Sequence, residues 1–255
     1  MTSGPAVRCA AVLAAALAWI AETSAQHSEP LRVLSSNGVR AAIEALEPQC
    51  ERSIGHSVAI EYGTSASIQQ RVASGERLDV ALGTTEVVVA LAKGGHLASE
   101  SIAPLGRAGI GLGVRAGTHH YKIGTAEEIK QTLLDARSVA YAQDGASRPH
   151  IERMFERLGI AEQMKAKAVL EQGSVRAAAK VVGGEAEILL TLVSEILPVQ
   201  GMELLGALPA EFQSYISFDA AVAAKPADPA LARALLACVA APAAAPTFAA
   251  KGIER

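Results

Sequence analysis

Residues 31–39, LRVLSSNGV, decide how this chain folds. Four mostly apolar residues lead into small polar ones, and apolar residues then recur at helical spacing from position 39 to position 50. The pattern predicts a buried strand that runs directly into a helix. The N–H groups at such a helix start are unpaired and carry the positive end of the helix dipole, so the junction is suited to an anion.

The same kind of junction occurs four times in the sequence. A strand-like segment ends in small hydroxyl or glycine residues and a helical pattern follows, at 35–38, 63–65, 145–147 and 173–174. One such junction is most simply an ordinary N-cap, because Ser, Thr and Asn are the common residues there. Four junctions that face one another would form a trap for a small anion.

Strand and helix patterns alternate along the chain in two series. The first has expected strands at 31–34, 58–62 and 78–82, and the second at 138–142, 168–171, 187–192 and 202–205. Strands separated by helices are mostly parallel, because a parallel connection needs a crossover. The sequence therefore predicts an α/β protein with two lobes, each a mostly parallel sheet flanked by helices.

Two further strand-like segments, 108–114 and 218–224, stand where the chain would cross between the lobes, and they predict a two-strand hinge. The expected limits are 31–112 plus 216–255 for lobe 1 and 113–215 for lobe 2. Ligands of open α/β sheets bind beyond the carboxyl ends of the strands, and all four junctions lie at such ends.

The first 25 residues have the features of a secretory signal peptide. One positive charge precedes the apolar run 9–20, and small residues that suit cleavage follow at 23–25. The run is shorter than the ~20 residues that span a bilayer. Cleavage would release a periplasmic chain of about 230 residues.

The mature chain would contain two cysteines, Cys50 and Cys238, each on the apolar stripe of an expected helix. A disulfide between them stays open, but buried free cysteines are the favoured expectation, because cysteine often behaves as a small hydrophobic residue.

Composition and motifs exclude several classes of protein. Half of the residues are hydrophobic, 19% are charged and the net charge is −3 without a run of one sign, so no nucleic-acid partner is expected. Gly109, Gly111 and Gly113 fall inside an apolar run and so do not form a dinucleotide fingerprint. The six histidines lack the spacing of a helical metal pair, and no serine has a hydrolase context. We expect no cofactor, no metal and no enzyme.

Several segments resemble the periplasmic molybdate-binding proteins of ABC importers, which are type II solute-binding proteins. The similarity rests on 31–39, on 58–75 followed by LDVAL at 78–82, and on GAS at 145–147, FERLG at 155–159 and SVR at 174–176. It covers nearly the whole mature chain. The resemblance implies the two-lobed periplasmic binding protein fold and the delivery of a small oxyanion, molybdate or tungstate, to an ABC permease in the inner membrane.

In the family that this chain resembles, serine hydroxyls, backbone amides and one tyrosine hydroxyl hold the oxyanion. Carried over by position, these donors correspond to the hydroxyl of Ser65 and to the amides of Ser147 and Val175. Gly38 stands where the family has its first ligand serine, and Thr191 or Leu192 stands where the tyrosine is expected. The expected ligand-binding residues are Ser36, Asn37, Gly38, Thr64, Ser65, Ser147, Arg148, Ser174, Val175 and Thr191.

Other interpretations remain open on the same residues. Arg148 replaces a small residue of the family and Arg176 follows the fourth junction, so each is either a partner for a carboxylate or a solvated residue of a first helical turn. A small organic carboxylate is therefore the alternative ligand. A sensory module with the same fold is a further alternative, and we expect a monomer in each case.

Overall fold

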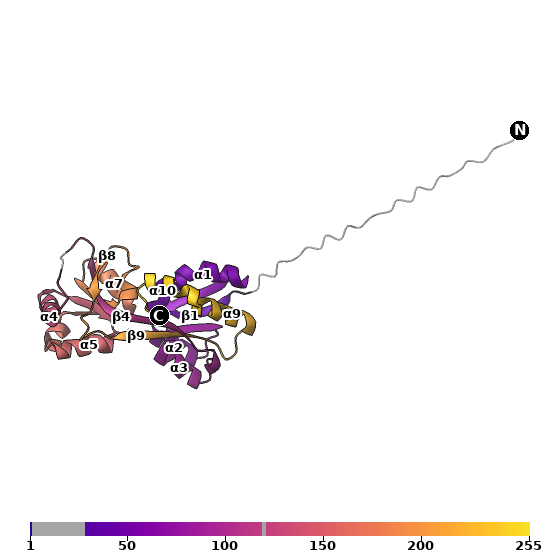
Figure 1. The fold of residues 1–255 in the computed structure, drawn as a ribbon, viewed down its shortest axis with the longest axis horizontal. Coiled ribbons are helices and arrows are strands. Elements are labelled where there is room, and N and C mark those ends of the chain that lie inside the picture. The colour runs from indigo at the N-terminus through magenta and orange to yellow at the C-terminus, as the bar shows by residue number, and fades with distance from the viewer. Residues whose placement is uncertain (2–28, 119–120) are drawn as a thin grey trace.

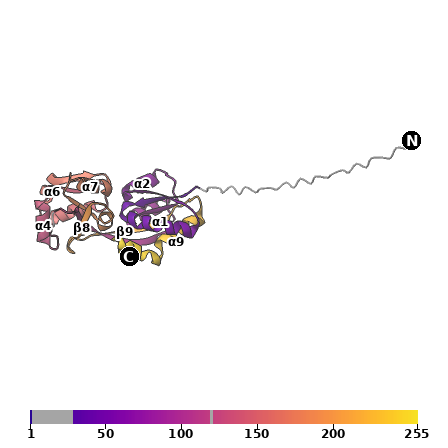
Figure 2. The same ribbon diagram turned by 90° about the horizontal axis from the view of Figure 1, so that it is seen from above.

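The structure is a computed structural model, and it describes residues 29–118 and 121–255 together with Met1. The predicted signal peptide, 1–25, lies outside these two ranges. Two groups of helices and strands lie side by side in Figure 1 and Figure 2. The first lobe contains β1 (Leu31–Ser36), α1 (Arg40–Ile54), β2 (Val58–Gly63), α2 (Ser65–Ala73), β3 (Val80–Thr84), α3 (Thr85–Lys93), α9 (Pro229–Ala240) and α10 (Ala245–Ala250).

The second lobe repeats the alternation of strands and helices. It contains α4 (Ala126–Asp135), β5 (Val139–Ala142), α5 (Arg148–Arg157), α6 (Ala161–Lys167), β6 (Ala168–Glu171), α7 (Gly173–Val182), β7 (Ile188–Leu192), α8 (Val193–Ile196) and β8 (Met202–Ala207). Short 3₁₀ turns are η1 (Asn37–Val39), η2 (Ser99–Ser101) and η3 (Pro242–Ala244).

Two long strands, β4 (Ala103–Arg115) and β9 (Tyr215–Val222), connect the lobes. The strand order is β2-β1-β3-β9-β4-β7-β5-β6, and β8 also pairs with β4. The strands β2, β1 and β3 are parallel, as are β6, β5 and β7, whereas β4 and β9 run antiparallel to their neighbours. The predicted α/β class with two lobes and a two-strand hinge is confirmed. The predicted lobe limits, 31–112 plus 216–255 and 113–215, stay a prediction.

The glycines of β4 allow close packing where the strand changes partners. The strand pairs with β9 as far as Gly109 and with β7 from Ile110 onward. A Cβ on Gly111 would lie 2.8 Å from the Gly206 carbonyl oxygen, and one on Gly113 would lie 2.9 Å from Ile196. The glycine series therefore serves a tightly packed crossing strand, as the sequence predicts.

Apolar side chains fill both faces of the two sheets. The helices α1, α9 and α10 cover one face of the first lobe, and α2 and α3 cover the other with residues such as Ile68 and Leu91. In the second lobe α4, α5 and α6 cover one face, and α7 covers the other through Ala177 and Val181. Because both faces of each sheet are buried, the sequences of the parallel strands are almost continuously apolar.

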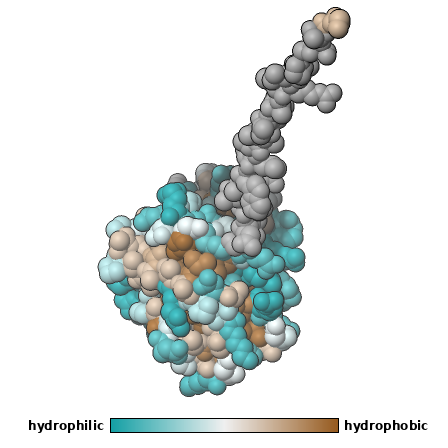
Figure 3. All heavy atoms as spheres, turned by 90° about the vertical axis from the view of Figure 1, so that its right-hand side faces the viewer, coloured by the Kyte–Doolittle hydropathy of each residue, from teal (hydrophilic) through white to brown (hydrophobic). Residues whose placement is uncertain are grey.

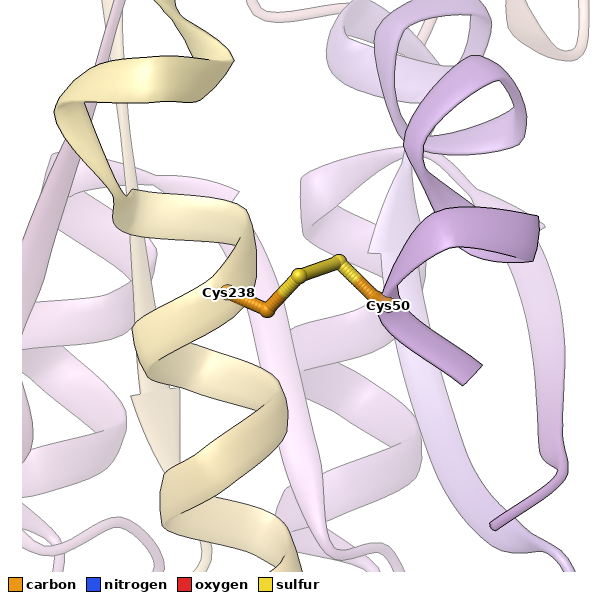
Figure 4. Close-up of a disulfide and its surroundings, with 2 residues drawn as sticks. All are labelled: Cys50 and Cys238. Atoms are coloured by element: carbon orange, nitrogen blue, oxygen red, sulfur yellow. A yellow bond between two sulfur atoms is a disulfide. The ribbon is translucent and has the colours of Figure 1, made fainter. Parts of the chain in front are cut away.

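The expectation of free cysteines is wrong, because Cys50 and Cys238 form a disulfide with their Cα atoms 5.8 Å apart. Figure 4 shows the bond joining α1 to α9. These two helices pack against each other on the same face of the first lobe, although 188 residues separate the cysteines in sequence. Helical periodicity places each cysteine on an apolar stripe, but it does not say which stripes meet.

The outer surface is mixed in character. Figure 3 views the end of the molecule that lies at the right of Figure 1, where hydrophilic residues alternate with a smaller apolar area. In the part of the chain that the structure describes, no single helix is long and apolar enough to cross a membrane. One bent pair, Pro229–Ala240 with Pro242–Ala250, satisfies that test by length and composition only.

Candidate functional site

A small cavity lies between the lobes and brings the four predicted junctions together. Its accessible volume is about 20 Å³. The cavity is therefore small in this closed arrangement, and a ligand of the size of a tricarboxylic acid requires the lobes to move apart. The lining residues are Ser36, Asn37, Gly38, Thr64, Ser65, Ala142, Gly145, Ala146, Ser147, Ser174, Thr191, Leu192, Glu195 and Phe218.

The first lobe contributes hydroxyl groups that its own backbone holds in place. Ser36 ends β1, and its Oγ accepts a hydrogen bond from the Gly38 N–H at 3.3 Å. Ser65 begins α2, is buried, and its Oγ accepts from the Thr84 N–H at 3.0 Å. Because these oxygens act as acceptors inside the protein, their hydroxyl hydrogens remain to be directed at an acceptor in the cavity.

Gly38 has a steric reason to lack a side chain. A Cβ at this position would lie 2.3 Å from the ring of Phe218 and 3.2 Å from Leu192. Phe218 is buried in β9 and also lines the cavity. The position at which the related family has a ligand serine therefore has no room for a hydroxyl group here, and an apolar ring borders the cavity.

The second lobe contributes Ser147 and Ser174. Ser147 precedes α5 and is buried, and no backbone group of that helix binds its hydroxyl. Ser174 lies in the first turn of α7, and its Oγ donates a hydrogen bond to Glu195 Oε1 at 2.8 Å. The two serines thus differ, because the Ser174 hydroxyl already has a partner on the cavity wall.

Hydrogen bonds join the two lobes beside the cavity. Thr64 Oγ1, at the start of α2, donates to Asp144 Oδ2 at 3.2 Å, and Asp144 Oδ1 accepts from the Gly173 N–H at 2.8 Å. Ser194 Oγ donates to the Gly38 carbonyl oxygen at 2.7 Å. These contacts hold the lobes close together around the cavity.

Two of the predicted ligand-binding residues do not line the cavity. Arg148 Nε donates to Glu152 Oε1 at 2.7 Å and its Nη1 donates to the Gln143 carbonyl oxygen at 2.8 Å, so the guanidinium is occupied within its own lobe. Val175, whose backbone amide was the expected donor, is 55% exposed and is not among the lining residues, so a role of its amide stays a prediction. The other eight, Ser36, Asn37, Gly38, Thr64, Ser65, Ser147, Ser174 and Thr191, lie on the cavity wall.

The sequence reasoning missed Glu195, which among the described residues is the only ionisable side chain on this wall. Its carboxyl group accepts hydrogen bonds from the hydroxyls of Ser174 and Thr191. Burial raises the pKa of Glu195, and the bonds from these hydroxyls and from the Leu192 backbone oppose the rise only in part. The cavity therefore combines neutral hydroxyl donors with one carboxyl group that is unusually easy to protonate.

A sequence signal for Glu195 exists, although it is weak. The short helix α8 starts after Leu192 and Glu195 is its third residue, the position at which a glutamate reaches back to the N-cap backbone. A helix of four residues has too few turns to show an apolar period, so no helix is expected between the strands at 187–192 and 202–205. The spacing of four residues between Thr191 and Glu195 is the remaining signal.

Other types of site have less support. Among the described residues, no three His, Cys, Asp or Glu side chains gather as metal ligands. A wider hollow of about 600 Å³, lined by Arg115, Tyr121 and Arg137, lies away from all four junctions. The cavity between the lobes is therefore the candidate ligand site.

The chain matches the family model of bacterial extracellular solute-binding proteins over residues 31–254. An aconitate isomerase of a Pseudomonas species is 32% identical over 219 residues, which are 84% of this chain and 83% of that protein. This relative carries the name of an enzyme, whereas the matching family is one of binding proteins.

Solved structures show the same fold at low sequence identity. The periplasmic molybdate-binding protein of Azotobacter vinelandii has a TM-score of 0.77 and 18% identity, with 88% of this chain and 99% of that chain covered. The sulfate-binding protein SubI of Mycobacterium tuberculosis has a TM-score of 0.69 and 17% identity, with 88% and 86% covered. The resemblance to the molybdate-binding proteins is thereby confirmed for the fold.

Proposed function

This chain belongs to the family of bacterial extracellular solute-binding proteins, and we propose that it binds a small organic carboxylate between its two lobes. One observation carries the proposal. The cavity wall combines hydroxyl groups of both lobes, which suit an anion, with Glu195, which does not suit an anion that carries no proton.

Proton sharing with Glu195 favours a carboxylate over sulfate, because hydrogen sulfate is a much stronger acid than a carboxylic acid. Two unit charges 4 Å apart repel by ~4 kcal/mol at an effective dielectric constant near 20. Neutral pH leaves sulfate, molybdate and the carboxylates all ionised, so an ionised Glu195 would repel each of them at this distance and a shared proton is needed in every case. A carboxyl group and a carboxylate share a proton readily, because their proton affinities are similar. The relative named as an aconitate isomerase adds support for an organic acid.

The expected cellular role follows from the family. Cleavage of the predicted signal peptide would place the protein in the periplasm, where it would act as a monomer. Closure of lobe 1 (31–112 plus 216–255) on lobe 2 (113–215) would present the loaded protein to an ABC permease in the inner membrane, because only the closed form would offer both lobes in the right relation.

Isothermal titration calorimetry with a panel of anions tests this proposal. The panel contains cis-aconitate, trans-aconitate, citrate, succinate, sulfate and molybdate, each added to the mature protein at pH 7. We expect micromolar or tighter binding of at least one carboxylate and weaker binding of both tetrahedral oxyanions. Tight binding of molybdate together with no heat from any carboxylate would contradict the carboxylate assignment and restore the oxyanion expected from the sequence.

A second candidate function is isomerisation of an unsaturated carboxylate, and Glu195 is the observation that favours it. Moving a double bond along such an acid requires one base to take a proton from one carbon and return it to another. Of the described residues on the cavity wall, Glu195 is the one whose side chain is a carboxylate base. Proton NMR of cis-aconitate incubated with the protein in D₂O tests this function, since conversion to the trans isomer supports it and an unchanged spectrum opposes it.

A further inference from the structure

The groups that contact the carboxyl group of Glu195 are neutral hydrogen-bond donors, so they do not compensate a negative charge on it. Hydroxyls of Ser174 and Thr191 donate to its two oxygens, and its own helix position ties it to the Leu192 backbone. In the part of the chain that the structure describes, no arginine or lysine lines the cavity. The remaining lone pairs of the carboxyl oxygens therefore border the space that the anion would occupy.

Several charged groups near the cavity form pairs or hydrogen bonds of their own. Asp144, in the loop after β5, accepts from Gly173 and Thr64, and Arg148 of α5 pairs with Glu152. Arg40, at the start of α1 beyond η1, pairs with Glu44. On α7, Lys180 pairs with Glu171 and Glu185, and Arg176 is exposed. Within the described residues, neither β7 nor α8 carries another ionisable side chain.

We propose that one proton is held between Glu195 and the bound anion, so that binding takes up a proton and selects ligands able to share it. The inference rests on the proposed function in placing an anion in this cavity. A charged carboxylate and a charged ligand cannot occupy the small cavity together at low cost, because no cation compensates them. Binding takes up one proton from solvent where both free Glu195 and the free ligand are ionised, and it takes up none where either of them already holds the proton.

This proton linkage has a defined direction with pH. Where free Glu195 is ionised, binding takes up a proton from solvent. The proton concentration falls tenfold with each pH unit, so binding becomes less favourable as the pH rises. The dissociation constant therefore rises about tenfold per pH unit for one proton taken up. At low pH, where free Glu195 already holds its proton, the affinity becomes constant.

Calorimetry of the wild type and of Glu195→Gln tests the inference. The probes are cis-aconitate and sulfate, each titrated between pH 6 and pH 9 in two buffers of different ionisation enthalpy. For the wild type we expect proton uptake that increases toward one as the pH rises and free Glu195 becomes ionised, with a dissociation constant that then rises up to tenfold per pH unit. For Glu195→Gln we expect no proton uptake and a nearly constant affinity, because the amide is neutral throughout.

Glutamine is the conservative replacement, since Gln is accepted at the third helix position as readily as Glu and the hydroxyls of Ser174 and Thr191 can rotate to accept from its amide. Glu185→Gln is the matched control, because Glu185 is exposed and pairs with Lys180 far from the cavity wall. This control should show the wild-type pH dependence. Equal thermal unfolding temperatures of the three proteins exclude a folding defect as the cause of any difference.

The outcomes separate this inference from the proposed function. Tight cis-aconitate binding with the same affinity from pH 6 to pH 9 in the wild type would overturn the proton linkage and leave the carboxylate function standing. Sulfate binding alone, stronger at low pH and independent of pH in Glu195→Gln, would support the linkage and contradict the carboxylate function. Wild-type behaviour of Glu195→Gln with either probe would also overturn the linkage.

Discussion

At the scale of single residues, small hydroxyl groups and one carboxyl group define the cavity. The hydroxyl oxygens of Ser36 and Ser65 accept hydrogen bonds from backbone N–H groups of their own lobe, and these bonds fix the position of each hydroxyl. Phe218 packs where a side chain at Gly38 would lie, so this side of the cavity is apolar. The anion would therefore meet oriented neutral donors, whose strength in a dry cavity exceeds their strength in water.

The first residue-scale prediction concerns Ser65. Ser65→Ala removes one hydroxyl donor from the cavity and should weaken ligand binding roughly tenfold or more, because a hydrogen bond to a charged group contributes ~1.5–3 kcal/mol. Calorimetry with the carboxylate that the panel identifies measures the change. Ser74→Ala is the control, since Ser74 is exposed at the far end of α2. Equal affinity of Ser65→Ala and wild type would remove Ser65 from the site.

The sequence reached some of these residues and missed others for a physical reason. Ser36, Thr64, Ser65, Ser147 and Ser174 could be predicted, because each follows a strand and opens a helix. The contacts that long side chains make could not be predicted from the sequence in this way. Nothing local distinguishes an arginine that reaches a cavity from Arg148, which folds back onto Glu152. Glu195 belongs to a helix too short to leave a periodic pattern.

At the scale of secondary-structure elements, the pairing of α1 with α9 brings distant parts of the chain together. The disulfide between Cys50 and Cys238 fastens the C-terminal helix to the first helix of lobe 1. The apolar stripe of each helix could be predicted from the sequence. The contact between α1 and α9, in contrast, depends on the order of the strands in the whole sheet. Periodicity also predicts most strands, but it passes over α6 and α8, which have seven and four residues.

Removal of the disulfide should destabilise the mature protein. The double variant Cys50→Ser, Cys238→Ser should lose about 2–5 kcal/mol of unfolding free energy, because the bond closes a long loop of the unfolded chain. Urea unfolding followed by circular dichroism measures the loss, and a reducing agent should destabilise the wild type but not the variant. An unchanged unfolding midpoint in both comparisons would show that the bond does not constrain the chain.

At the scale of the whole molecule, two lobes joined by β4 and β9 create a site that neither lobe contains alone. The alternation of strands and helices predicted this architecture, because parallel strands require crossovers and the two crossing segments mark the hinge. The direction in which the junctions face could not be read from any local pattern. The direction depends on the orientation of each lobe relative to the hinge strands. In the structure, hydrogen bonds from Thr64 to Asp144 and from Ser194 to Gly38 hold the two lobes in that orientation.

A crystal structure of the mature protein grown with cis-aconitate tests the central claim most directly. The account predicts electron density for a carboxylate group within hydrogen-bond distance of Ser65, Ser147 and Glu195, enclosed by both lobes. Density for the ligand on another surface, or a carboxylate bound by one lobe with Glu195 turned away, would contradict the account.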